Sequence, residues 1–164
     1  MSETFKVHVT KDHLVFCSGH FISYEGDKCE RLHGHNYRTA VEIEGDLDTN
    51  YYVFDFIALK NRTKAITDEL DHRMLLPTRN PHIRLEQGPR GVHVRYRDRE
   101  WLFPVDECVL LPIENTTAEL LARYISQRLL ADLHRHHQFQ PEAIRVEVEE
   151  SFGQSATYEW RSAH

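Results

Sequence analysis

The stretch KCERLHGHNY, residues 28–37, carries a thiol at Cys29 four residues before a His-Gly-His pair, and a regular strand pattern follows directly. Because alternate side chains of a β-strand share a face, His33 and His35 are expected to point the same way. That face continues through residues that suit a buried surface: Tyr37, Thr39, Val41 and Ile43. The opposite face between residues 38 and 44 is mostly charged. The pattern therefore predicts two imidazoles at the end of a buried strand face.

Two imidazoles at one place suggest a metal ion. A zinc site needs a third protein ligand, and it keeps a fourth position open if the metal is catalytic. His20, which closes the segment 16–20, is our candidate for that third ligand. A His-x-His pair in a strand also serves packing or hydrogen bonding, and the chain contains 12 histidines, so the pair by itself leaves both interpretations open.

The composition is that of an ordinary soluble globular protein, with 40% hydrophobic and 28% charged residues. A length of 164 residues fits one domain with a real core. The formal charge of −6 argues against nucleic acid or an anionic membrane as the main partner. Three cysteines without paired spacing indicate a reducing compartment. No apolar run reaches membrane-spanning length and the N-terminal residues are polar, so we expect a cytoplasmic protein.

Two amphipathic helices are predicted. Asp55 is a plausible N-cap for the first, whose three-four spacing gives the apolar set Phe56, Leu59, Thr63, Ile66 and Leu70. The second starts after Pro112, with Thr116 and Glu119 as a capping box. Asp71 and His72 fall at the end of the first helix, where a histidine is also electrostatically favoured without any catalytic role.

Strands are predicted on both sides of the helices. Residues 5–9 and 14–16 form one long bulged strand or two short ones, and residues 35–44 form another. Near the C-terminus, Ile144, Val146 and Val148 alternate with charged residues, which places Glu150 on the apolar face unless the strand ends before it. Strands paired by hairpins beside segregated helices indicate an α+β fold.

These pieces together resemble the 6-pyruvoyl-tetrahydropterin synthase / 6-carboxytetrahydropterin synthase family. The matching motifs occur in the family's order and cover most of the chain outside residues 78–111: FCSGH at 16–20, CxxxHGH at 29–35, VFDF at 53–56, LDH at 70–72, NTTAE at 115–119, and ES at 150–151. The gap of three residues between Cys29 and His33 resembles the bacterial carboxy branch, which serves queuosine biosynthesis.

The resemblance implies a tunnelling fold (T-fold), in which a ββααββ subunit with an antiparallel sheet and two helices assembles into a homohexamer made of two trimers. Active sites in such enzymes lie between subunits. We expect a single domain over residues 1–164. Residues 78–111 are longer than compact members of the family require, and their alternation predicts an added β-hairpin.

The resemblance also implies roles for individual residues. The ligands of Zn²⁺ would be His20, His33 and His35. The base would be Cys29, with a pKa lowered by His72 and with Asp71 orienting that histidine, both from a neighbouring subunit. Glu150 would anchor the pterin ring through two parallel N–H bonds, and Glu119 and Thr117 would be further substrate contacts.

The implied reaction converts 7,8-dihydroneopterin triphosphate to 6-carboxy-5,6,7,8-tetrahydropterin with loss of triphosphate and acetaldehyde. Three alternatives stay open: a 6-pyruvoyl-tetrahydropterin synthase, which only eliminates triphosphate; a non-catalytic pterin-binding hexamer; and a structural zinc protein with a fourth protein ligand. Residue by residue, Glu119 could be a capping residue only, and Glu150 could lie in solvent.

Overall fold

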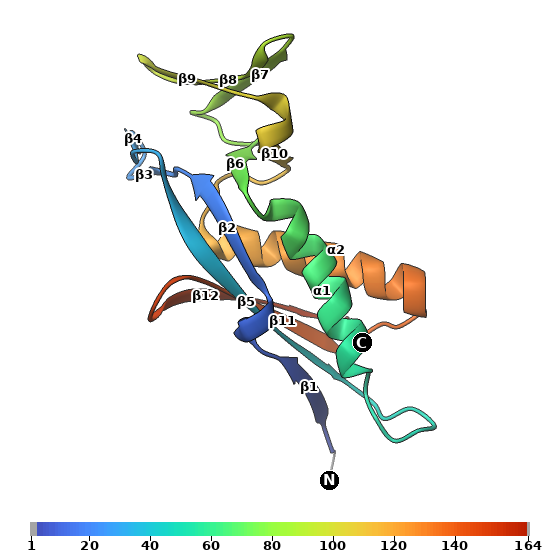
Figure 1. Ribbon diagram of the computed structural model, residues 1–164. Coiled ribbons are helices and arrows are strands. Elements are labelled where there is room, and N and C mark those ends of the chain that lie inside the picture. The colour runs from blue at the N-terminus through green and yellow to red at the C-terminus, as the bar shows by residue number, and fades with distance from the viewer. Residues whose placement is uncertain (1–2, 164) are drawn as a thin grey trace.

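The computed structural model describes residues 3–163. Its main body is a seven-stranded sheet with strand order β10-β6-β2-β5-β11-β12, and β1 pairs with the far end of β5. The strands of this sheet are β1 (Phe5–Val9), β2 (Val15–His20), β5 (His33–Gly45), β6 (Arg73–Pro77), β10 (Cys108–Leu111), β11 (Ala143–Ser151) and β12 (Gln154–Arg161). Two helices, α1 (Phe56–Leu70) and α2 (Ala118–His137), lie on one side of the sheet (Figure 1).

The long strand β5 organises the sheet because three other strands pair with it. β1 and β2 are two separate strands, joined by the short 3-10 helix η1 (Lys11–His13), and both run antiparallel to β5. β11 pairs with the other edge of β5. The α+β architecture of two helices against a curled sheet is confirmed, but the sheet is mixed, because β6 runs parallel to both β2 and β10. The expected antiparallel pairing is therefore only part of the observed sheet. Each parallel pair joins residues far apart in sequence, which local alternation does not report.

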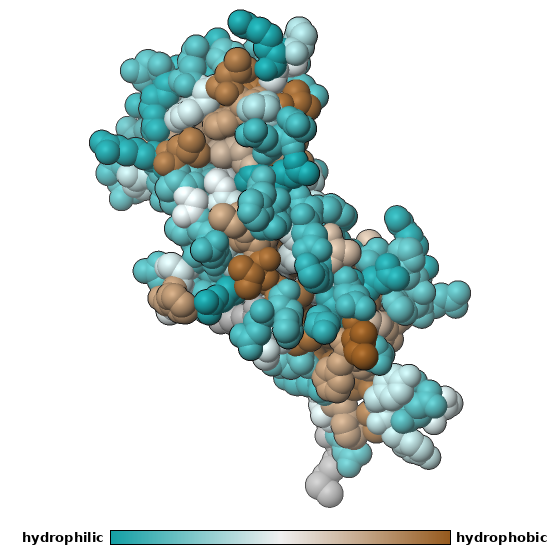
Figure 2. Space-filling view, viewed as in Figure 1, coloured by the Kyte–Doolittle hydropathy of each residue, from teal (hydrophilic) through white to brown (hydrophobic). Residues whose placement is uncertain are grey.

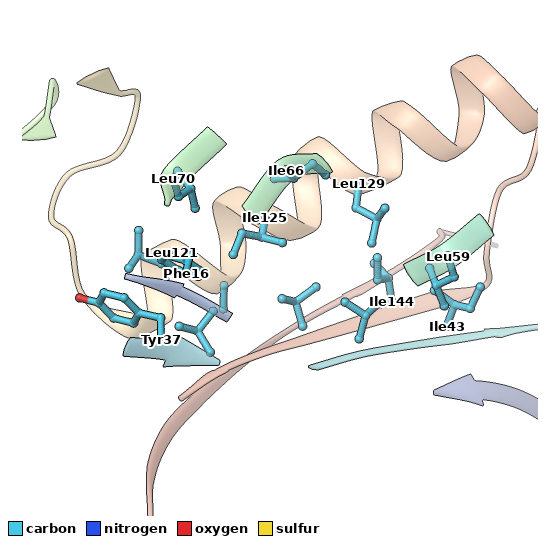
Figure 3. Close-up of a cluster of buried hydrophobic side chains, with 14 of the residues drawn as sticks. Phe16, Tyr37, Ile43, Leu59, Ile66, Leu70, Leu121, Ile125, Leu129 and Ile144 are labelled. Carbon is cyan, nitrogen blue, oxygen red and sulfur yellow. The ribbon is translucent and has the colours of Figure 1, made fainter. Parts of the chain in front are cut away.

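The predicted inner face of β5 is confirmed. Tyr37, Thr39, Val41 and Ile43 are all fully buried. Tyr37, Val41 and Ile43 belong to a buried cluster that also contains residues of both helices, and Figure 3 shows Phe16 and Tyr37 beside Leu121 at one end of this cluster. The apolar face of α1 is confirmed except at its first residue, because Phe56 is 60% exposed. Neither helix in residues 3–163 combines the length and the hydropathy that a membrane span requires.

A second, smaller sheet stands at one end of the molecule, beyond β6 and β10 (Figure 1). It consists of β7 (Arg84–Gly88), β8 (Gly91–Tyr96) and β9 (Arg99–Phe103), each antiparallel to the next. The predicted hairpin is therefore a three-stranded meander, followed by the 3-10 helix η2 (Val105–Glu107). Its inner side has a core of its own, made by Phe21, Met74, Leu76, Ile83, Val92, Val94 and Tyr96. Figure 2 shows polar and apolar side chains interspersed over this end.

A two-stranded hairpin, β3 (Ser23–Tyr24) and β4 (Lys28–Cys29), lies between the two sheets. It follows directly on β2 and leads into β5, so it connects His20 to His33. The thiol of the opening motif is therefore carried by a short hairpin at the junction of both sheets.

Candidate metal centre and active site

Three histidines from two paired strands meet at one end of the main sheet. The antiparallel register places His20, the last residue of β2, opposite His33, the first residue of β5. The ring centroids lie 4.7 Å apart for His20 and His33, 4.8 Å for His33 and His35, and 5.2 Å for His20 and His35. The structure therefore brings together all three residues that the sequence suggested as ligands.

The glycine between the two histidines of β5 is required by this close approach. A Cβ at Gly34 would lie 3.0 Å from the carbonyl oxygen of Ser18 on β2, a distance that real Cβ contacts rarely show. Gly34 lies directly opposite Gly19. Two glycines thus let β2 and β5 approach closely where the imidazoles gather.

Glu150 joins the histidines from β11. Its Oε1 lies 2.7 Å from His35 Nε2 and 3.7 Å from His20 Nε2. One ligand atom from each of these four side chains lies within 4.8 Å of all the others. Glu150 is half-buried, with 30% of its side chain exposed, so the inward position is confirmed against the alternative of a solvated strand end.

Backbone carbonyls fix how two of the imidazoles are turned. His20 Nδ1 lies 2.9 Å from the carbonyl oxygen of Thr116, and His33 Nδ1 lies 2.7 Å from that of Arg31. A carbonyl only accepts, so each Nδ1 carries the proton and each Nε2 keeps a free lone pair when the ring is neutral. Such an outer partner is typical of metal-binding histidines.

The electrostatics of His20 favour the neutral ring. Burial lowers its pKa to about 4, because the hydrogen bond to Thr116 only partly offsets the desolvation and the nearby His33 and His35 lower the pKa further. Its buried Nε2 has no hydrogen-bond partner, and that of His35 has none either, since Glu150 lies close but not along a hydrogen-bonding direction. The buried Nε2 atoms of His20 and His35 thus lie near the carboxylate of Glu150 without a hydrogen bond to it.

This donor set fits a divalent transition metal. Three imidazole nitrogens and a carboxylate oxygen are ligands that Zn²⁺ accepts in tetrahedral sites. A cation among the four groups would give the unpartnered Nε2 atoms of His20 and His35 a partner and offset the charge of Glu150. The residues present therefore fit the group that the sequence suggested.

Cys29 lies on the neighbouring hairpin, partly buried against the second core. Its Sγ lies 3.5 Å from the carbonyl oxygen of Glu30. Burial raises the pKa of this thiol, the positive charge of Arg99 opposes the rise, and Glu30 adds to it. In the part of the chain that the structure describes, no hydrogen bond or ion pair joins Cys29 to Asp71 or His72 of the same chain. The predicted lowering of the pKa of Cys29 concerns His72 of a neighbouring subunit and stays a prediction.

Asp71 and His72 form a pair at the end of α1. His72 Nδ1 lies 2.8 Å from Asp71 Oδ2, and the backbone N–H groups of both residues turn back to the last turn of α1 and to β2. The backbone N–H of Cys17 donates to Asp71 Oδ1 at 2.7 Å and holds the pKa of that carboxyl below its usual range. The His72 side chain is 82% exposed, with a left-handed backbone (φ 56°). Hydrogen bonds to Cys17 thus fix the pair to strand β2 of the same chain, and the imidazole of His72 points into solvent.

The start of α2 differs from the predicted capping box. The N-cap is Thr117, whose Oγ1 accepts from the backbone N–H of Leu120 at 3.4 Å, and Glu119 is exposed in the first turn. Thr116 is instead buried beside His20, and its Oγ1 donates to the carbonyl oxygen of Phe21 at 3.2 Å. Thr116 and Thr117 are adjacent and both residue types suit an N-cap, so the sequence alone missed the contact of Thr116 with His20.

Glu30 was also not singled out from the sequence. Its Oε2 lies 3.8 Å from His33 Nε2 and accepts from the backbone N–H of Ile22 at 3.2 Å. The only signal available beforehand was its position between Cys29 and the histidine pair. It is the second carboxylate at the edge of the cluster, besides Glu150.

Comparison with known proteins gives a consistent result. The sequence model of the 6-pyruvoyl tetrahydropterin synthase family matches residues 8–161. A putative 6-carboxy-5,6,7,8-tetrahydropterin synthase of Methanocaldococcus jannaschii is 34% identical over 146 residues, 88% of this chain and 89% of that protein. A putative enzyme of the same name from Pyrococcus abyssi is 36% identical over 126 residues, 76% of this chain and 73% of that protein.

The fold comparison agrees with the sequence comparison. The 6-pyruvoyltetrahydropterin synthase of Plasmodium vivax, in a variant in which a catalytic glutamate is replaced by alanine, superposes with a TM-score of 0.89 at 27% identity. The match covers 98% of this chain and 100% of the Plasmodium chain. With its family motif, its relatives and its fold in agreement, the chain belongs to the 6-pyruvoyl tetrahydropterin synthase family of pterin-metabolising lyases.

Proposed function

We propose that this enzyme is a zinc-dependent lyase that converts 7,8-dihydroneopterin triphosphate to 6-carboxy-5,6,7,8-tetrahydropterin with loss of triphosphate and acetaldehyde, in the cytoplasmic synthesis of queuosine. The observation that carries the proposal is the buried, unpartnered Nε2 of His20, which faces His33, His35 and Glu150. The names of the two curated relatives reported above favour the carboxy product.

His20, His33 and His35 would hold the zinc. When bound, Zn²⁺ supplies Lewis-acid polarisation of a substrate oxygen, which makes the proton on the adjacent carbon easier to remove. The hydrogen bonds to Thr116 and Arg31 keep the rings of His20 and His33 turned towards that position. These ring orientations exist before any substrate binds.

Cys29 would take the proton from the substrate carbon. Burial raises its pKa in the single chain, so a base of this kind needs help from outside the chain. His72 is exposed and paired with Asp71, so it would be accessible to a second copy of the chain. We therefore propose active sites between subunits of a homohexamer, in which the His72 of one chain stabilises the thiolate of its neighbour.

Glu150 would anchor the pterin ring, because a carboxylate accepts two parallel N–H bonds from a guanidine-like edge. Because its carboxylate lies within 4.8 Å of the ligand atoms of the three histidines, one substrate molecule could contact both Glu150 and the metal. Thr117 and Glu119, at the start of α2, would be additional contacts, and Thr117 also caps that helix. Residues 78–111, which carry β7 to β10, would be an addition to the compact subunit.

A second candidate product is 6-pyruvoyl-tetrahydropterin, favoured by the names of the solved structures with the same fold. A second candidate base is Glu30, since its carboxylate lies 3.8 Å from His33 Nε2 and the related Plasmodium enzyme has a catalytic glutamate. Both candidates use the same metal position.

The test is to load the purified protein with Zn²⁺, add 7,8-dihydroneopterin triphosphate, measure triphosphate and identify the pterin product by mass spectrometry. We expect the carboxy product, and Cys29→Ala should lower the rate by a factor of about 100 to 10,000, the usual contribution of a general base. Glu30→Gln is the matched comparison on the adjacent residue. A wild type that binds zinc and releases no triphosphate contradicts the proposal, and a larger loss in Glu30→Gln assigns the base to the carboxylate.

A further inference from the structure

The small β7–β9 sheet contacts the hairpin that carries Cys29. From β9, Arg99 Nη1 donates to the carbonyl oxygen of Cys29 and Nη2 donates to that of Glu30, each at 3.0 Å. The Tyr96 hydroxyl, at the end of β8, donates to the carbonyl oxygen of Asp27 in the same hairpin. The sheet therefore binds the backbone of the thiol-bearing segment at three points.

Arg99 is itself held in place. Its guanidinium lies over the ring of Trp101, 4.8 Å from the centroid, and Trp101 stacks on the buried Phe21 with ring centroids 4.6 Å apart. Phe21 directly follows the metal-ligand candidate His20. A planar guanidinium supported on an aromatic face offers its two N–H groups in a fixed fork, which suits two neighbouring oxygens.

Among the described residues, Arg99 forms no ion pair. Its neighbours on the same sheet behave differently: Arg95 Nε lies 2.9 Å from Glu100, and Arg97 lies 3.8 Å from Asp27. Within residues 3–163 no carboxylate lies at ion-pair distance from Arg99, and both recorded hydrogen bonds go to main-chain carbonyls. The arginine is therefore committed to the backbone of residues 29 and 30.

One of those carbonyls is also the partner of the thiol. Cys29 Sγ lies 3.5 Å from the carbonyl oxygen of Glu30, which is the oxygen that Arg99 Nη2 binds. The other side of the hairpin is held by Glu30, whose backbone N–H donates to Ile22 at 2.9 Å and whose side chain accepts from it. Arg99 thus holds the carbonyl side of residues 29 and 30, including the Glu30 carbonyl oxygen that lies near the Cys29 thiol.

We propose that Arg99 is a positioning residue for the proposed base: it couples the β7–β9 sheet to the active site by holding the carbonyls of Cys29 and Glu30, and so sets where the thiol points. This inference rests on the proposed catalytic role of Cys29. In this role the β7–β9 sheet would support the active site without contacting the substrate. The positive charge of Arg99 also opposes the rise that burial causes in the pKa of the Cys29 thiol, which favours the thiolate that a base requires.

The experiment compares Arg99→Gln and Arg99→Lys with Arg95→Gln, a control on the same sheet that removes a surface ion pair and leaves the hairpin untouched. In zinc-loaded enzyme we expect Arg99→Gln to lower kcat about 10- to 100-fold, the scale of a small misplacement of a catalytic group, with KM and zinc content near the wild-type values. Arg99→Lys keeps the charge without the fork, so it should recover only a small part of kcat.

Two measurements do not depend on activity. Amide hydrogen exchange in a peptide covering residues 24–32 should be faster in Arg99→Gln, while peptides of β8 and β9 keep the wild-type rate. The rate at which iodoacetamide modifies Cys29, followed by mass spectrometry with the exposed Cys17 as internal reference, should change in Arg99→Gln and stay constant in Arg95→Gln.

Three results would overturn the proposal: exchange and alkylation of the hairpin that match the wild type in Arg99→Gln, faster exchange throughout β8 and β9 as well, or full recovery by Arg99→Lys. The second would mean that Arg99 only stabilises the small sheet, and the third that charge alone matters. If the wild type releases no triphosphate, the proposed function fails while exchange and alkylation still decide whether Arg99 positions the hairpin.

Discussion

Buried polar groups lie at both ends of strand β5, and the two ends differ in whether all of these groups have hydrogen-bond partners. At the C-terminal end, Glu44 is nearly buried but fully partnered: Arg145 on β11 donates to it at 3.3 Å, and Arg161 on β12 lies 3.5 Å away. At the N-terminal end, the Nε2 atoms of His20 and His35 are buried without a hydrogen-bond partner. A satisfied polar group stabilises a fold, whereas an unsatisfied one costs stability and needs another reason to persist. The comparison separates a structural end of the strand from a chemical one.

The largest expected effect comes from His35→Ala at the chemical end. We expect activity to fall to background and zinc content, measured by metal analysis after dialysis, to drop well below the ratio of about one per chain expected of a three-histidine site. The apo-protein should melt at or above the wild-type apo temperature, because a buried unpartnered nitrogen is removed. If the variant unfolds, the site is structural and the contrast between the two ends disappears.

Glu150→Gln separates two roles for the carboxylate next to His35. As a pterin anchor, Glu150 loses a charge-assisted contact, so kcat/KM should fall about 10- to 100-fold, equivalent to roughly 1.5–3 kcal/mol, while zinc stays bound. If Glu150 is instead a fourth metal ligand, Glu150→Gln should lower the zinc affinity. Isothermal titration with Zn²⁺ beside steady-state kinetics distinguishes the two, with Glu149→Gln on the same strand as the control.

Arg145→Met tests the structural end. Its guanidinium also donates to Glu42 at 2.6 Å and to Glu159, and its side chain is 20% exposed, so the effect should lie between those of surface and buried pairs, about 2 kcal/mol lost in urea unfolding. Arg161→Met, at a 52% exposed site, should cost under about 1 kcal/mol. Zinc content and kcat should be unchanged in both.

Acid should abolish this difference between Arg145→Met and the wild type. Burial would raise the pKa of Glu44, but the hydrogen bond from Arg145 and the charges of Arg161 and Lys6 outweigh it, and the pKa lies below its ordinary value of 4.5. A lowered folded pKa gives stability that is complete above 4.5 and is lost as the pH falls through the folded value. The two unfolding free energies should therefore converge below pH 4.5, and a constant gap would contradict the account.

Thr116→Val is the smallest change at the chemical end. It removes the hydroxyl beside His20 and leaves the main-chain carbonyl that the ring binds, so zinc affinity should fall about tenfold, the low end for an outer partner of a ligand. Thr63→Val, which removes an equally buried hydroxyl from α1, should alter the melting temperature and leave zinc affinity alone. Equal zinc affinities in all three proteins would remove Thr116 from the site.

The parts of the fold that the sequence predicted correctly rest on local periodicity. Alternation in β5 and the N-cap at Asp55 were predictable because neighbouring residues determine them. His20 followed because a strand ended there and a ligand was lacking. The parallel pairing of β6 with β2 and the hydrogen bonds from Arg99 to residues 29 and 30 were not predictable. Both join segments far apart in the sequence, and local periodicity carries no information about such contacts.

The hydrogen bond between Asp71 and β2 makes two functions depend on the register of that strand. The same short strand ends in His20 and, three residues earlier, supplies the N–H that fixes Asp71. A shift of this strand by one residue would turn the imidazole to the opposite face and withdraw that donor in the same movement. In the proposed homohexamer, a chain with β2 out of register would therefore lose both its own metal position and the Asp71–His72 pair that it would offer to a neighbouring subunit.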